Sequence, residues 1–176
     1  YIKAAWVYHM LRGIVGDSVF FSTIKAITSD PSCAHGTITT NRFRNIAERV
    51  SGLNLDKFFQ QWIMGEYYPN YAYSWTYSEK EPGYELELTV QQVQNAQLFW
   101  MPVDVAVQTA SGVERFVVWD SLETQVFRFD IEDVPKSVTL DPDNWVLNKA
   151  SDVTGIENTR IQKARVEVFP NPSYDQ

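Results

Sequence analysis

Residues 54–77 read NLDKFFQQWIMGEYYPNYAYSWTY, and the hydrophobic pattern changes its period within this stretch. The first half has apolar residues at the three- and four-residue spacing of one helix face. These residues are Phe58, Phe59, Trp62 and Ile63. The second half has an aromatic residue at every second position from Tyr71 to Tyr77, which is the spacing of a strand. The stretch therefore predicts that a helical part ends and a β part begins near residues 66–70.

Three more helices are predicted upstream of this boundary. Asp17 is a suitable cap for a second helix, and Thr39 or Thr40 is suitable for a third, which Gly52 would end. The first stretch, YIKAAWVYHMLRGIVGD, is apolar on every side, and such a helix is normally buried all round. We therefore expect the chain to be a piece of a larger protein. Without its upstream neighbours, the helix at residues 1–15 is expected either to be poorly ordered or to pack against a second copy, as a homodimer caused by truncation.

Downstream, six short segments alternate apolar and polar residues and are separated by turns, which indicates strands with one buried face. No helix lies between them, so parallel crossovers are not expected. The predicted fold class is α+β. It consists of a small all-helical subdomain (1–66) followed by an antiparallel, immunoglobulin-like β-sandwich (70–149). Residues 150–165 read as a linker, and residues 166–176 begin a new strand.

Composition excludes several classes of function. The chain has 176 residues and a formal net charge of −7, so a nucleic acid is not expected as a partner. No apolar run approaches the roughly 20 residues of a membrane-spanning helix. The single cysteine, Cys33, lies in a predicted loop and is interpreted as incidental.

A complete active site is not visible in this sequence. His9 and His35 are the only histidines, and neither has a partner at metal-ligand spacing. His9 is interpreted as a packed, hydrogen-bonded core residue. We therefore predict no metal site and no cofactor site in this chain.

Two other motifs have competing interpretations. The aromatic residues from Tyr71 to Tyr77 could stack on sugar rings, but their strand face is more simply the inside of the sandwich. The stretch LDPDNW places Asp141, Asp143 and Asn144 close together. A calcium loop needs further ligands that are missing, so a turn is preferred.

Three stretches in order resemble the aminopeptidase N-like zinc metallopeptidases, the gluzincins. The first is YIKAAWVYHMLRGIVGDSVFF at residues 1–21, the second is NLDKFFQQWIMGEYYPNY at 54–71, and the third is VTLDPDNWVL at 138–147. The resemblance covers about residues 1–149. It implies a secreted zinc aminopeptidase that cleaves N-terminal residues from peptides, with zinc ligands upstream of this chain. Isolated from that upstream catalytic-domain segment, the chain is expected to be inactive.

The same resemblance implies a role for Tyr1. Tyr1 matches the family's tyrosine that donates a hydrogen bond to the oxyanion formed during peptide hydrolysis. A departure occurs at Ala4, where many members have glycine. Tyr1 is the only catalytic residue predicted here, and its role applies only within the parent protein, which would contain zinc.

The tail has a separate resemblance. VEVFPNPSYDQ at residues 166–176 is similar to the opening of a C-terminal sorting domain of the type IX secretion pathway of Bacteroidota. It implies a secreted or cell-surface location in such a bacterium. Two alternatives to the peptidase stay open. One is a non-catalytic sandwich that binds carbohydrate or protein, and the other is a peptidase relative that has lost its zinc ligands.

Overall fold

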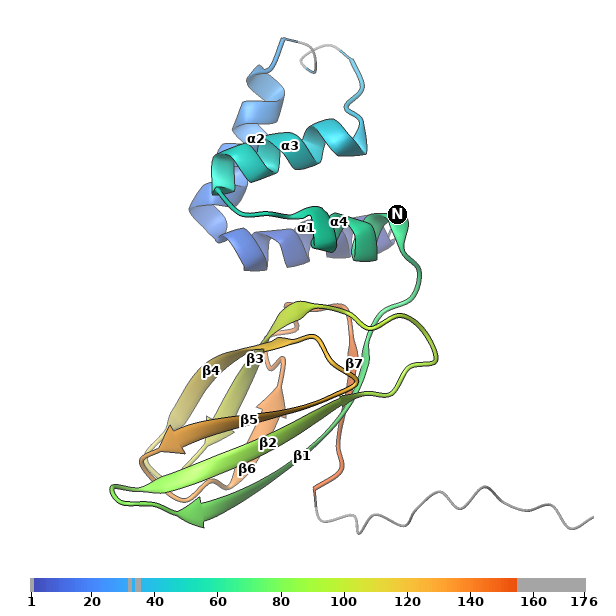
Figure 1. The fold of residues 1–176 in the computed structure, drawn as a ribbon. Coiled ribbons are helices and arrows are strands. Elements are labelled where there is room, and N and C mark those ends of the chain that lie inside the picture. The colour runs from blue at the N-terminus through green and yellow to red at the C-terminus, as the bar shows by residue number, and fades with distance from the viewer. Residues whose placement is uncertain (1, 32, 34–35, 155–176) are drawn as a thin grey trace, which may run out of the picture.

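The computed structural model describes residues 2–31, 33 and 36–154. In this described part, a layer of helices lies across one end of a β-sandwich (Figure 1). The helices are α1 (Ile2–Val15), α2 (Asp17–Ser29), α3 (Thr40–Ser51), α4 (Asp56–Phe59) and the π-helical turn η1 (Gln60–Met64). The predicted order of a helical part followed by a β part is confirmed. So is the α+β class.

Two sheets form the sandwich. The strands are β1 (Asn70–Glu79), β2 (Tyr84–Gln92), β3 (Met101–Gln108), β4 (Val113–Asp120), β5 (Thr124–Ile131), β6 (Ser137–Leu140) and β7 (Lys149–Asp152). One sheet has the order β5-β2-β1-β7, and the other has the order β4-β3-β6. Alternating side chains of β2 and β3 are buried, as their period of two predicts.

One pairing differs from the prediction. β7 lies parallel to β1, with Asn70 opposite Lys149 and Tyr73 opposite Asp152. A parallel pair requires a long crossover, and the five strands β2 to β6 provide it without a helix. The exclusion of parallel pairing was therefore wrong. The first residues of the segment predicted as a linker, from residue 150, belong to this strand. The later part of that segment and the predicted sorting strand at 166–176 lie outside the described residues.

The capping predictions are correct for α3 but not for α2. The Thr39 side chain accepts a hydrogen bond from Arg42 N at the start of α3, and Gly52 ends that helix in the left-handed conformation, as predicted. Asp17 is not the cap of α2, because Gly16 occupies that position. Asp17 instead forms an ion pair with Arg12 at 2.7 Å, in the first turn, where a negative charge is favourable.

The fourth predicted helix widens into the π-helical turn η1. Phe58, Phe59 and Trp62 are buried as expected, but Ile63 is 37% exposed. A π-helical turn places more residues in each turn than an α-helix does, so the helical spacing used to orient Ile63 no longer holds.

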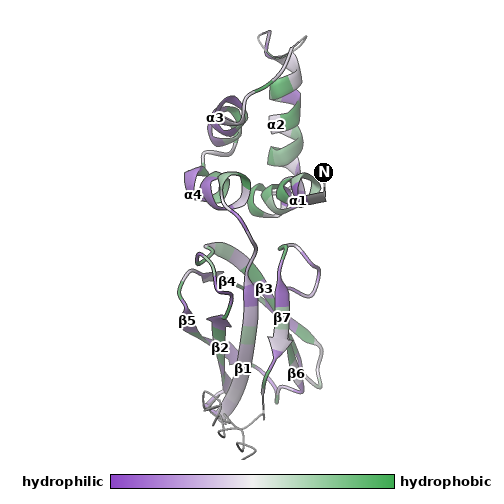
Figure 2. Cartoon of the chain, turned by 90° about the vertical axis from the view of Figure 1, so that its right-hand side faces the viewer, coloured by the Kyte–Doolittle hydropathy of each residue, from purple (hydrophilic) through white to green (hydrophobic). Residues whose placement is uncertain are grey.

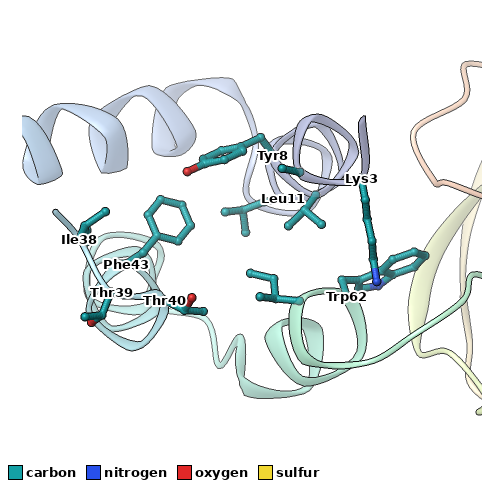
Figure 3. Close-up of a pocket in the computed structure, with 11 residues that line it drawn as sticks. Lys3, Tyr8, Leu11, Ile38, Thr39, Thr40, Phe43 and Trp62 are labelled. Carbon is teal, nitrogen blue, oxygen red and sulfur yellow. The ribbon is translucent and has the colours of Figure 1, made fainter. Parts of the chain in front are cut away.

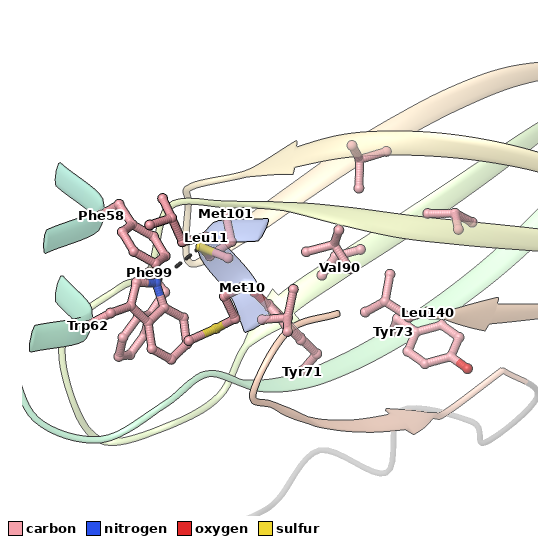
Figure 4. Packing of buried hydrophobic residues seen from close by; sticks show 14 of the residues in the cluster. Met10, Leu11, Phe58, Trp62, Tyr71, Tyr73, Val90, Phe99, Met101 and Leu140 are labelled. Carbon is pink, nitrogen blue, oxygen red and sulfur yellow. Dashed lines mark hydrogen bonds between the residues drawn. The ribbon is translucent and has the colours of Figure 1, made fainter. Parts of the chain in front are cut away.

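Among the described residues, one hydrophobic core runs from the helices into the sandwich (Figure 4). Met10 and Leu11 of α1 are each 1% exposed and belong to the same buried cluster as Tyr71 of β1. Trp62 is fully buried, and its indole N–H lies 3.1 Å from the Met101 sulfur. The helical part is therefore packed on the sandwich rather than tethered to it.

This packing changes the interpretation of α1. Figure 2 shows that α1 is largely hydrophobic and lies next to the sandwich. Val7, Met10 and Leu11 are buried. Among the large hydrophobic side chains of α1 whose burial the structure describes, only Tyr8 is exposed, at 44%. The sandwich therefore covers part of the apolar surface of α1, which the sequence pattern alone did not indicate. The predicted homodimer stays a prediction. No described helix is both long enough and apolar enough to span a bilayer.

Candidate functional site

An apolar pocket of about 300 Å³ lies within the helical part, between α1, α3 and η1 (Figure 3). The larger part of its apolar lining is formed by Val7, Tyr8, Leu11, Phe43, Trp62 and Ile63, and Ala4 and Ile38 complete it. Val7, Tyr8 and Leu11 recur at helical spacing on one face of α1, and the π-helical turn brings Trp62 and Ile63 to the opposite wall. The Tyr8 and Phe43 rings meet edge to face, with their centroids 5.5 Å apart. The pocket is thus formed by residues that the sequence predicts as core.

Polar groups occur at two sides of this pocket. Lys3 lies beside Trp62, and its ammonium donates a hydrogen bond of 2.8 Å to the Gly65 carbonyl. Thr39 and Thr40 lie at the start of α3 on the other side. None of these groups forms a nucleophile–base pair. The pocket can therefore hold an apolar group beside an ammonium, but the residues described around it do not form a complete catalytic apparatus.

The contact between Lys3 and Gly65 joins two parts of the chain that are distant in sequence. Lys3 belongs to the first stretch that carries the peptidase resemblance, and Gly65 belongs to the second. Gln61 of η1 binds the chain before β3, because its side chain donates to Leu98 O at 2.9 Å and accepts from Trp100 N at 3.0 Å. The two stretches are therefore fixed together at the end of the sandwich.

The structure describes some of the residues singled out in the sequence analysis and not others. Tyr1 and His35 lie outside the described residues, so the predicted role of Tyr1 is untested. Cys33 is half-buried in the segment between α2 and α3. His9 is packed and hydrogen-bonded as predicted, but at the surface of the helix–sandwich junction. Its ring stacks on Trp145 at 4.6 Å, and its Nε2 lies 3.1 Å from a backbone carbonyl oxygen in the LDPDNW turn.

The turn interpretation of LDPDNW is confirmed. Asp141 is buried with a φ of 50°, and its carboxylate accepts hydrogen bonds from Trp145 N at 2.7 Å, Val146 N at 3.0 Å and Asn148 Nδ2 at 2.6 Å. Asp143 instead pairs with Arg115 at 2.5 Å. The carboxylates of Asp141 and Asp143 thus bind backbone and side-chain groups of the protein itself. Within residues 2–31, 33 and 36–154, no group of three His, Cys, Asp or Glu side chains could hold a metal ion.

The aromatic residues of β1 divide between core and surface. Tyr71 is fully buried and Tyr73 is 7% exposed, in agreement with the core interpretation. Tyr77 is 47% exposed at the far end of the strand, where it packs on Tyr84. The core interpretation therefore holds for the half of β1 nearer the helices.

A buried polar cluster near the helices was not predicted from the sequence. Asp120, at the end of β4, is 0% exposed and accepts a hydrogen bond of 2.6 Å from Gln92 Nε2. Burial raises the pKa of Asp120 to about 6. Among the described residues, Asp120 Oδ1 and the Tyr71 hydroxyl are buried without a hydrogen-bond partner. The alternation of β4 could have indicated that Asp120 is buried, because it places Asp120 on the same face as Phe116 and Val118.

Comparisons with known proteins support the fold but do not establish a family. No family model and no curated protein sequence matches the chain. A crystal structure of Legionella pneumophila aminopeptidase A in complex with aspartic acid is similar, with a TM-score of 0.67 and 17% sequence identity. The match covers 86% of this chain and 17% of that chain. The chain thus spans about a sixth of the aminopeptidase that it matches. It shares with that protein the arrangement of its helices and strands.

Proposed function

We propose that this chain forms part of an aminopeptidase-type zinc metallopeptidase. Residues 1–66 would complete the peptidase domain, and the following β-sandwich would be its immunoglobulin-like neighbour. The observation that carries the proposal is the similarity to the aminopeptidase structure over 86% of the chain. The hydrogen bond between Lys3 and Gly65 supports it, because it joins the two stretches that resemble the peptidase family.

Zinc does not fit the described residues, because they contain no suitable group of ligands. Under the proposal, the zinc ligands belong to a part of the polypeptide other than these residues, and we derive no step through the metal. What this chain would contribute is Tyr1, as a neutral hydrogen-bond donor to the developing oxyanion. The hydrogen bond from Lys3 to the Gly65 carbonyl would hold the first turn of α1 in place.

Secretion is a further part of the proposal. The tail at residues 166–176 would begin a sorting domain that directs the protein to the surface or the exterior of a Bacteroidota-type bacterium. Its support is the sequence VEVFPNPSYDQ, and these residues lie outside the described part of the chain.

The test requires this chain joined to the polypeptide encoded directly upstream in its gene. We expect that longer protein to hydrolyse aminoacyl anilides and to lose activity with a zinc chelator. Tyr1→Phe should lower kcat and kcat/KM by about 10²–10³ with little change in KM, because the lost interaction forms mainly in the transition state.

The matched control is Tyr77→Phe, since Tyr77 is an exposed tyrosine at the far end of β1. Its activity should equal that of the unmodified protein. Absence of peptidase activity in the longer protein would contradict the proposed function. Unchanged turnover in the Tyr1 variant would remove only Tyr1 from the mechanism.

A further inference from the structure

A second hollow, of about 240 Å³, lies where α1 meets the outer face of β3 and β4. Pro102 and Asp104 of β3 line it, and they alternate with buried residues of that strand. Trp119 of β4 lies directly opposite Pro102, and Trp145 follows β6. Gly13 of α1 also lines the hollow. We call this feature the tryptophan hollow.

The two indoles of the tryptophan hollow come from opposite sides of β3. Trp119 belongs to the neighbouring strand, whereas Trp145 belongs to the turn held to the other side of β3 by the hydrogen bond from Asp141 N to Asp104 O, at 2.7 Å. On this face Trp119 is a diagonal neighbour of Asp104, because Trp119 lies opposite Pro102 and Val117 lies opposite Asp104. The Trp145 ring is stacked on His9, so the exposed Trp119 ring and the Asp104 carboxylate are the pair that can contact one flat group.

The aromatic surface already carries one cation. Trp119 is 44% exposed, and its ring packs against Trp100 at 4.5 Å. The ammonium of Lys57 lies 5.2 Å from the centre of the Trp100 ring. Indole is the aromatic group that attracts cations most strongly. The chain thus places a positive charge on the tryptophan pair next to the hollow.

Asp104 supplies a negative charge to the hollow. Within the described part of the chain, no side chain or backbone N–H donates a hydrogen bond to its carboxylate. The neighbouring guanidinium of Arg115 donates to Asp143 instead, and that bond, more than the attraction of Asp104, raises the pKa of Arg115. Arg115 attracts the Asp104 carboxylate electrostatically, but it donates its hydrogen bond to Asp143 and leaves the Asp104 oxygens open to another donor.

We propose that the tryptophan hollow binds the side chain of an arginine residue in a peptide partner. A guanidinium can stack on the exposed Trp119 indole, and its fork of N–H donors matches the neighbouring Asp104 carboxylate. The volume is below that of typical small-molecule pockets, which begin near about 300 Å³, so it suits one side chain better than a larger ligand. The net charge of −7 favours a cationic partner. This inference does not depend on peptidase activity.

The test is a titration of the ¹⁵N-labelled 176-residue chain, followed through its indole N–H signals. The probe is the peptide acetyl-Gly-Arg-Gly-amide. The neutral comparison is the same peptide with citrulline, which has nearly the same shape without the charge. We expect the arginine peptide to shift the Trp119 and Trp145 signals and to bind at least about tenfold more tightly than the citrulline peptide, a factor expected for one charge-assisted contact.

Two variants locate the binding. Asp104→Asn keeps the shape of the side chain, and Trp119→Leu removes one indole. Each should weaken binding of the arginine peptide about tenfold. The controls are Glu79→Gln and Tyr77→Leu, at the far end of β1, and they should bind as the unmodified chain does. The dispersion of the amide spectrum checks that each variant is folded.

Three results would overturn the inference. The first is equal binding of the arginine and citrulline peptides. The second is unchanged binding in the folded Asp104→Asn chain. The third is binding of free ethylguanidinium as tight as that of the peptide, which would assign the hollow to small organic cations rather than to a peptide.

Discussion

Replacing Asp120 with asparagine should stabilise the chain at neutral pH. The side chain is fully buried, and burial raises its pKa from 3.8 to about 6. The folded state therefore holds this proton more tightly than the unfolded state does. The resulting stabilisation is complete below about pH 4 and is lost as the pH rises from about 4 to about 6. A shift of about two pH units corresponds to about 3 kcal/mol.

The net gain is smaller than this value. Asparagine keeps an oxygen that can accept the hydrogen bond from Gln92, but the bond is no longer to a charged group, which costs about 1–2 kcal/mol. Above pH 7, we therefore expect a gain in the free energy of unfolding of about 1–2 kcal/mol. In a chain of this size, that gain raises the Tm by about 2–8 °C. At pH 3.5 the two proteins should differ little.

Thermal unfolding followed by circular dichroism between pH 3.5 and pH 8 measures this effect. The control is Asp130→Asn on β5, where an exposed ion pair with Lys80 is lost. That change should alter the free energy of unfolding by no more than about 1 kcal/mol. The reasoning is refuted if the Asp120 variant melts below the unmodified chain at pH 7.5 and keeps its pH dependence between pH 4 and pH 6.

Three further substitutions test the packing. Gly13→Ala should lower the free energy of unfolding by about 1–2 kcal/mol in urea, because the new Cβ would lie 2.9 Å from the Trp145 ring, whereas Gly36→Ala meets no atom within 4 Å and should be neutral. Trp62→Ala should cost about 3–5 kcal/mol by the same measurement, since Trp62 is fully buried; a loss below about 1 kcal/mol would contradict its central place in the core. Asp141→Ala should cost about 2–4 kcal/mol in thermal unfolding, because its buried donors lose their acceptor, and Asp141→Asn should restore part of that loss.

Much of the fold could be predicted because its pattern is local. The change of period between Trp62 and Tyr71 marks the junction of helices and strands, since each period assigns side chains to one buried face. The cap at Thr39 and the stop at Gly52 have local causes as well. Each of these features depends on residues only a few positions apart.

The features that were missed depend on contacts distant in sequence. β7 has the sequence KASD, with no large apolar residue, and its place beside β1 depends on backbone bonds such as Lys149 N to Pro69 O. The apolar pocket combines residues of α1, α3 and η1, whose distances from one another no periodicity encodes. Asp120 follows the inward alternation of β4, but a charged residue at the end of a strand is normally expected to be solvated.

The parallel pairing of β7 with β1 has a mechanical consequence. β1 begins beside the helices, and β7 runs in the same direction along the first four residues of β1, so Asp152 lies farther from the helices than Lys149 does. Tension between the helical part and the chain beyond residue 154 would pull the two strands lengthwise past each other. The backbone bonds of the pair, from Lys149 N to Pro69 O through Val153 N to Tyr73 O, then bear the load together. A pull of this kind must break them at once, whereas peeling β7 sideways from the edge would break them one at a time.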